Sequence, residues 1–276
     1  MDFLGLRTLT VIRDAEAAIQ KKDPSFSIRK LDYDDAATYK MLGQGETEGV
    51  FQLESSGMKQ VLVGLQPQNL EDVIALISLY RPGPMDSIPT YLRNRHEPDK
   101  ISYKTPQLAH ILDVTNGCIV YQEQVMQIFR ELAGFSFGQA DNVRRAMSKK
   151  KHAVMEAERE HFVHGCTEPG HECPGCVANG ISEKVANEIY DEMSSFASYA
   201  FNKSHAACYA YVAFQTAYLK CHYPSEFMAA LLTSVLDNTD KVIEYSGECA
   251  RLGIKVLPPD VNISNGGFTA DNGKIR

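Results

Sequence analysis

The strongest cationic cluster of this 276-residue chain is formed by Arg144, Arg145 and the run Lys149-Lys150-Lys151. These five basic residues fall within eight positions, although the formal net charge of the chain is −7. A guanidinium group presents its N–H donors as a planar fork, which suits phosphate oxygens better than an ammonium group does. Neighbouring helical residues diverge by about 100°. We therefore expect one arginine to point into an anion site while the other packs or reaches a second phosphate oxygen. A solvated basic helix end is the alternative.

A second group of donors lies in Phe201-Asn202-Lys203-Ser204-His205, directly before the apolar run from Ala206 to Pro224. Asn202 or Ser204 can cap a helix that begins here, and Lys203, Ser204 and His205 then lie at the positive end of its dipole. Such a helix start can bind an anion. The alternative is an ordinary capped helix with a solvated Lys203. The helix is apolar nearly all round, so we expect it to be buried, with Cys208 in the core.

Two further positions present polar groups at helix ends. Arg81 precedes Pro82-Gly83-Pro84, which must end a helix. Tyr121 and Gln122 open another helix, where Glu123 complements the dipole. Arg81, Tyr121 and Gln122 are therefore additional site candidates, although helix-end electrostatics explains Arg81 and Glu123 equally well.

One short loop gathers four soft metal ligands, Cys166, His171, Cys173 and Cys176. A Cys-x2-Cys element with Pro-Gly inside it can aim two thiolates at one zinc ion, and Cys166 and His171 could complete a tetrahedral structural site. The spacing is not that of a standard zinc finger. The alternative is a surface loop with oxidisable thiols.

The elements that must position these residues are mainly helices. Apolar periodicity, capping residues and Pro or Gly breaks predict helices over 8–21, 35–43, 55–65, 69–80, 122–132, 138–147, 152–163, 183–193, 202–222, 226–236 and 240–252. Residues 49–54 and 254–257 are expected to be extended, and Asn272-Gly273 predicts a hairpin turn. The fold class is therefore mostly α, with a few short strands near the ends.

Composition places the chain among globular proteins, with 44% hydrophobic and 23% charged residues. No apolar run reaches transmembrane length, and the first residues show no secretory pattern. We therefore expect a cytoplasmic protein without a membrane partner. The negative net charge argues against nucleic-acid binding by the whole surface but not against a local basic patch.

Six segments of the chain together carry a family resemblance. They are Met1-Asp2-Phe3-Leu4-Gly5-Leu6, Gly49-Val50-Phe51-Gln52-Leu53-Glu54-Ser55, Leu79-Tyr80-Arg81-Pro82-Gly83-Pro84, Ile119-Val120-Tyr121-Gln122-Glu123-Gln124, Arg144-Arg145-Ala146-Met147 and Phe201-Asn202-Lys203-Ser204-His205-Ala206. In order and approximate spacing they resemble the bacterial replicative DNA polymerase III alpha subunit, a C-family polymerase. The likeness runs from Met1 to about Asn262.

The resemblance implies a division into three parts. Residues 1–6 would end the palm domain, 7–253 would form a helical fingers domain with a Cys/His-rich loop at 165–177, and 254–276 would begin a β-containing segment that is truncated. Asp2 matches the third catalytic aspartate, a Mg²⁺ ligand only together with two palm aspartates that the chain lacks. The fragment alone is therefore expected to be inactive.

The resemblance also implies a function, template-directed DNA synthesis by two-metal nucleotidyl transfer. Its partners would be a dNTP and primer-template DNA. The full-length protein would also bind the sliding clamp and other replisome subunits, through regions that this chain does not contain. Arg144, Arg145 and Lys203 match the cationic cradle for the incoming triphosphate, and Ser204 and His205 are donors beside them. The competing hypothesis is a helical interaction module organised around a structural Zn²⁺ loop. That loop is an insertion relative to many family members.

Overall fold

The computed structural model describes residues 5–149, 151–197 and 199–276, and this part of the chain is mostly helical. The α-helices are α1 Arg7–Gln20, α2 Ala36–Gly43, α3 Ser56–Leu65, α4 Leu70–Leu79, α5 Ile88–His96, α6 Ala109–Leu112, α7 Gln122–Ala133, α8 Phe137–Ser148, α9 His152–His164, α10 Gly175–Ala178, α11 Glu183–Ala197, α12 Lys203–His222, α13 Pro224–Ser234 and α14 Thr239–Arg251. Short 3-10 helices cover Ile28–Lys30, Pro84–Ser87, Pro98–Lys100, Pro106–Leu108 and Asp113–Thr115. The predicted fold class is confirmed.

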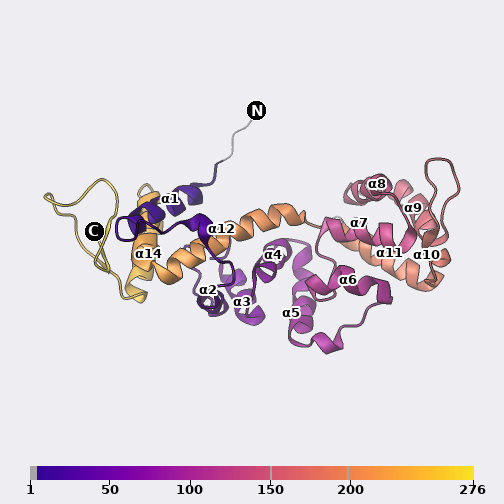
Figure 1. Cartoon of the computed structure of the whole chain (residues 1–276), viewed down its shortest axis with the longest axis horizontal. Coiled ribbons are helices and arrows are strands. Elements are labelled where there is room, and N and C mark those ends of the chain that lie inside the picture. The colour runs from indigo at the N-terminus through magenta and orange to yellow at the C-terminus, as the bar shows by residue number, and fades with distance from the viewer. Residues whose placement is uncertain (1–4, 150, 198) are drawn as a thin grey trace. The chain divides into compact units, whose positions relative to one another are not determined.

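The chain divides into two compact units (Figure 1). Unit 1 combines the residues up to Val73 with Cys208–Arg276, and unit 2 comprises Ile74–Ala207. The division falls inside α4 and α12. The three-part organisation that the resemblance implies stays a prediction.

The core of unit 1 is formed mainly by α1 and α13. The spacing of Val11, Ile12, Ala15, Ala18 and Ile19 predicts one apolar face of α1, and all of them except the partly buried Ala18 are buried. They pack against α13, in which every residue from Ser225 to Leu232 is buried. Helix α1 begins at Arg7, one residue before the predicted range 8–21, so that Thr8, a possible capping residue, lies inside it.

The strands form one small sheet in unit 1. Strands β1 (Lys255–Val256), β2 (Ala270–Asp271) and β3 (Lys274–Ile275) have the order β1-β3-β2, with β3 antiparallel to β2 and parallel to β1. Asn272 and Gly273 both have positive φ, 47° and 75°, so they make the predicted hairpin turn. Residues 49–54 are not extended as predicted. They form consecutive turns, with Gln52 at φ 63°.

The core of unit 2 is built around α7. Val125, Ile128, Phe129 and Leu132 are each 0% exposed and repeat with helical spacing. Helices α8, α9, α10 and α11 pack against α7. The rings of Phe129, Phe162 and Tyr190 contact one another inside this cluster. The first turn of α7 is thereby held on a rigid support. In the described part of the chain, helices that could span a membrane are absent.

Candidate functional site

The segments that lead into α7 and α12 lie side by side within unit 2. Tyr121 and Phe201 form an isolated parallel bridge, in which Phe201 N donates to Val120 O at 3.2 Å and Gln122 N donates to Phe201 O at 2.9 Å. The side-chain amide of Gln122 adds a bond to Ala200 O at 3.0 Å. Two helices that begin 81 residues apart in the chain therefore start next to each other.

The buried amide of Gln124 fixes the first of these two segments. Its Oε1 accepts the backbone N–H groups of Val120 and Tyr121, both at 2.9 Å. Its Nε2 donates to Ile111 O and to the hydroxyl of Thr115. Because every polar atom of this 4% exposed side chain is satisfied, Gln124 holds the backbone before α7 in one conformation. This role of Gln124 was not predicted, although a glutamine in the first turn of a helix is a known capping signal.

The arginine pair of α8 converges on one carboxylate, that of Asp141. Arg144 donates to Asp141 Oδ1 through Nε at 3.0 Å and Nη2 at 2.7 Å, while Arg145 Nη2 lies 2.8 Å from Asp141 Oδ2. Hydrogen bonds from Arg144, together with both positive charges, hold the pKa of Asp141 below its usual range. The two side chains differ in exposure, 18% for Arg144 and 64% for Arg145, although both bind Asp141. Their common partner was not predicted, although it precedes them by three and four positions.

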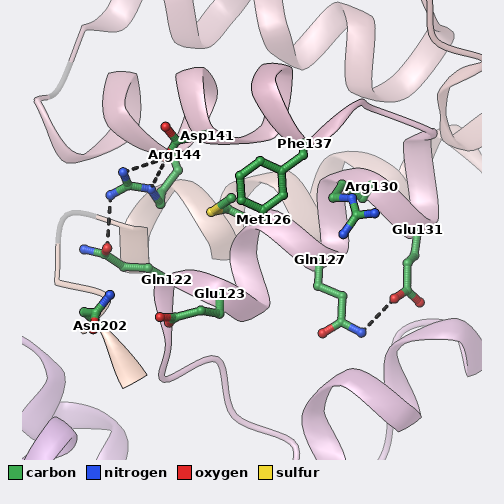
Figure 2. A pocket seen from close by; sticks show the side chains of 10 residues that line it. All are labelled: Gln122, Glu123, Met126, Gln127, Arg130, Glu131, Phe137, Asp141, Arg144 and Asn202. Atoms are coloured by element: carbon green, nitrogen blue, oxygen red, sulfur yellow. Dashed lines mark hydrogen bonds and ion pairs between the residues drawn. The ribbon is translucent and has the colours of Figure 1, made fainter. Parts of the chain in front are cut away.

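Arg144 also reaches the first turn of α7. Its Nη1 donates to Gln122 Oε1 at 3.0 Å, so Gln122 links the guanidinium of α8 to the backbone that precedes α12 (Figure 2). Gln122 thus lies next to Arg144, and its role as an additional site residue stays a prediction.

The start of α12 is capped from two sides. Asn202 Oδ1 accepts the N–H of His205 at 2.9 Å, which makes Asn202, not Ser204, the capping residue. The carboxylate of Glu123 accepts the N–H of Lys203 at 3.2 and 3.1 Å. The helix start that was predicted to bind an anion is thus occupied by the carboxylate of Glu123. The Lys203 ammonium lies 5.2 Å from the centre of the Tyr121 ring.

Phe201 is the aromatic centre of the segment before α12. The guanidinium of Arg81 lies 4.0 Å from the centre of its ring, and the His205 ring meets it edge-on at 5.3 Å. Arg81 also donates to Tyr199 O at 2.7 Å, while burial lowers its pKa. Arg81 therefore positions residues 199–201.

A cavity of about 480 Å³ opens beside these groups (Figure 2). It is lined by Gln122, Glu123, Met126, Gln127, Arg130, Glu131, Phe137, Asp141, Arg144 and Asn202. Three carboxylates face two guanidinium groups, so this lining carries one more negative than positive charge at neutral pH. Phe137, 65% exposed, lies across the cavity from the amide of Gln122 and offers an aromatic surface. A polyanion in this cavity would compete with Asp141 for Arg144 and with Glu123 for the N–H of Lys203.

The structure thus gathers most of the predicted site residues in unit 2. Arg144 and Gln122 line the cavity, whereas Arg145, Lys203, Ser204 and His205 lie on the helices that border it. Ser204 and His205 are exposed on the first turn of α12. Asp2 and Lys150 lie outside the described residues. Cys208 is exposed, and its predicted place in the core is wrong.

The predicted zinc loop does not assemble a metal site. All four proposed ligands are described, yet the described residues contain no cluster of three or more His, Cys, Asp or Glu side chains that could hold a metal ion. Cys176 is completely buried, whereas His171 is exposed. The hypothesis of a structural zinc therefore finds no support.

Comparisons with known proteins agree with the resemblance. Residues 8–170 match the family described as the bacterial DNA polymerase III alpha subunit finger domain. The DNA polymerase III subunit alpha of Thermus aquaticus is 49% identical over 274 residues, covering 97% of this chain and 22% of the relative. The proteins of the same name from Bacillus subtilis and Pasteurella multocida are 46% and 45% identical, covering 100% and 98% of this chain and 24% of each relative. The chain thus spans less than a quarter of the length of these relatives, and it belongs to the bacterial DNA polymerase III alpha subunit family, whose finger domain it contains.

Proposed function

We propose that unit 2 holds the triphosphate of an incoming deoxynucleotide during template-directed DNA synthesis. The observation that carries the proposal is the pair Gln122 and Glu123 in the first turn of α7. Gln122 binds Arg144 of α8, and Glu123 binds the first N–H of α12. Two adjacent residues therefore connect the two cationic elements that a triphosphate would need.

In this proposal the triphosphate replaces carboxylates as the partner of the cationic groups. Asp141 binds both Arg144 and Arg145, which leaves one positive charge uncompensated, and Glu123 occupies the start of α12. A triphosphate carries more negative charge than one carboxylate and offers oxygens in several directions. It can therefore engage both guanidinium forks and the N–H groups of a helix start at once. Lys203, Ser204 and His205 then supply further donors from the first turn of α12.

The whole-protein activity is proposed from the relatives, which are named DNA polymerase III subunit alpha. Substrates would be dNTPs and primer-template DNA, and a replisome would supply further partners. Two-metal catalysis needs Mg²⁺ ligands, but metal-holding clusters are absent from residues 5–149, 151–197 and 199–276. These residues therefore do not by themselves supply the Mg²⁺ ligands. Asp2 as a Mg²⁺ ligand stays a prediction from the resemblance.

The direct test is calorimetric titration of the purified chain with tripolyphosphate and with a dNTP. We expect Arg144→Ala/Arg145→Ala to weaken binding of both ligands by about tenfold or more, because each lost charged hydrogen bond is worth about 1.5–3 kcal/mol. The matched control is Lys104→Ala/Lys184→Ala, which also removes two positive charges but at residues outside the cavity lining. Equal affinities for the two double variants would contradict the proposal.

A further inference from the structure

Three cysteines lie around the hairpin that joins α9 to α10 in unit 2 (Figure 1). They are Cys166, Cys173 and Cys176, and each is a free thiol. The proposed nucleotide site does not use them, and they do not form a metal cluster. Their chemistry therefore needs a separate explanation.

Cys166 and Cys173 are directly opposite each other across this hairpin. They form an antiparallel bridge in which each N–H donates to the other residue's carbonyl, both bonds being 2.9 Å long. Such a hydrogen-bonded pair has its Cα atoms about 5.5 Å apart. That spacing lies within the range of about 4.4–6.8 Å found for disulfide-bonded cysteines. The backbone thus already has the separation that a disulfide requires.

Close backbone packing keeps the hairpin in this register. A Cβ atom on Gly175 would lie 2.3 Å from Gly165 N, and one on Gly165 would lie 2.5 Å from Pro174 O. Both glycines also have positive φ, 77° and 88°, which disfavours other residues. The glycines before Cys166 and after Cys173 therefore let the two arms approach each other.

The surroundings distinguish the three thiols. Cys166 is partly exposed and can meet a small oxidant, whereas Cys173 is 8% exposed and its Sγ lies 3.6 Å from His161 O. Cys176 is 0% exposed and belongs to the core of unit 2. Access therefore favours oxidation at Cys166, with Cys173 as the nearest resolving thiol.

We propose that Cys166 and Cys173 are a reversible redox pair that a peroxide converts to a disulfide. The Cys166 thiolate attacks hydrogen peroxide, so an S–O bond forms, the O–O bond breaks and, with one proton, water leaves. The Cys173 thiol then attacks the sulfenic sulfur, an S–S bond forms, the S–O bond breaks and a second water leaves. The two thiols lose two electrons and the peroxide gains them. A dithiol reverses the reaction by exchange.

The disulfide would join the end of α9 to the start of α10. Both helices pack against α7, whose first turn contributes to the cavity. Oxidation would therefore restrict a segment of unit 2 that supports the proposed site, without a change in any residue of the cavity lining.

The test uses the whole chain carrying Cys208→Ser, which removes an exposed thiol that could join two molecules. The protein is prepared with a chelator, treated with hydrogen peroxide, alkylated, and digested without reduction by a protease that cleaves after glutamate. Glu168 and Glu172 separate Cys166 from Cys173, so a disulfide between them links two peptides. We expect this linked pair, and we expect a dithiol to release it.

Two further variants distinguish the pairings. Cys176→Ser should still give the linked peptides, and Cys173→Ser should leave a Cys166 sulfenic acid that a dimedone probe captures. A bridge between Cys173 and Cys176 within one peptide, or loss of the linked pair in Cys176→Ser, would overturn the proposal. Identical circular dichroism of the reduced variants shows that folding is unchanged.

Discussion

Both carboxylate oxygens of Glu123 lie within hydrogen-bonding distance of the backbone nitrogen of Lys203, at 3.2 and 3.1 Å. A side chain from the first turn of α7 thereby neutralises the positive end of α12. The same cavity contains Asp141, whose carboxylate binds both arginines of α8. The two arginines of α8 and the first N–H group of α12 are thus each bound by an acidic side chain of the chain itself.

Replacement of this carboxylate should strengthen polyanion binding. In Glu123→Gln we expect tripolyphosphate affinity to rise about fivefold. The substitution removes one negative charge that repels the polyanion, and such a repulsion at about 4 Å is worth ~1 kcal/mol in water. Glu131→Gln is the control, since Glu131 lines the same cavity but contacts His110 and Gln127 instead. Calorimetry on both variants measures the difference. An equal gain in the two would mean that only the overall charge of the cavity matters.

Arg144 and Arg145 should differ in their effect on stability. Arg144→Ala removes bonds to Asp141 and Gln122 from a side chain that is 18% exposed, so the free energy of unfolding should fall by about 1–3 kcal/mol. Arg145→Ala removes a 64% exposed ion pair and should cost less than about 1 kcal/mol. Urea denaturation measures both values. Equal losses would show that the contacts of Arg144 contribute no more than a surface pair.

The guanidinium of Arg81 should be irreplaceable by an ammonium group. Arg81→Lys keeps the charge but loses the planar stacking on Phe201 and the fork that reaches Tyr199 O. We expect a loss of about 1–2 kcal/mol in the free energy of unfolding. Arg145→Lys, on an exposed side chain, serves as the control and should be close to neutral. If Arg81→Lys is as stable as its control, the stacked geometry does not support residues 199–201.

Acid should weaken a buried ion pair in unit 1. Lys220 Nζ lies 2.7 Å from Glu248 and donates to the carbonyls of Glu46 and Glu48, while Arg251 binds Glu248 with two further bonds. Burial alone would raise the pKa of Glu248, but the hydrogen bonds from Arg251 and Lys220 outweigh it and hold this pKa below 4.5. Burial also lowers the pKa of Lys220, but a fall in pH favours its charged form, so acid acts on this pair through Glu248.

The sign of the pH effect follows from the lowered pKa. The stability that Glu248 contributes is fully present above pH 4.5 and is lost as the pH falls through the folded-state value. Glu248→Gln should lower the free energy of unfolding by about 3–5 kcal/mol at neutral pH, because the buried ammonium of Lys220 loses its nearest carboxylate and keeps only that of Glu48, 3.9 Å away. The difference in stability between wild type and Glu248→Gln should become smaller as the pH is lowered from 6 to 3, which thermal unfolding at each pH measures. Glu244→Gln, which removes an exposed partner of Lys241 on the same helix, is the control. A gap that is independent of pH would contradict this assignment.

The sequence alone determined the local elements, because their signals lie within a few residues. Apolar spacing predicts the buried face of α1 apart from Ala18, which is only partly buried, and α2 is capped by Asp35, where the predicted helix 35–43 begins. Asn272-Gly273 likewise predicts its hairpin. The turns at residues 49–54 were mistaken for extended chain, since a short apolar run does not identify its own conformation.

Only the tertiary structure decided how the charged groups are paired. Glu123 is 80 residues from Lys203 and Gln122 is 22 residues from Arg144, and no local pattern connects such distant positions. The residue pattern identifies the cations and lets Glu123 complement a helix dipole, but it does not show that Glu123 binds the start of α12 or that Asp141 binds both arginines. The spacing of the four Cys and His residues likewise predicts a zinc site, whereas the described residues contain no such cluster. Residue types and spacing determine which groups are available, whereas the packing of distant segments determines which of them meet.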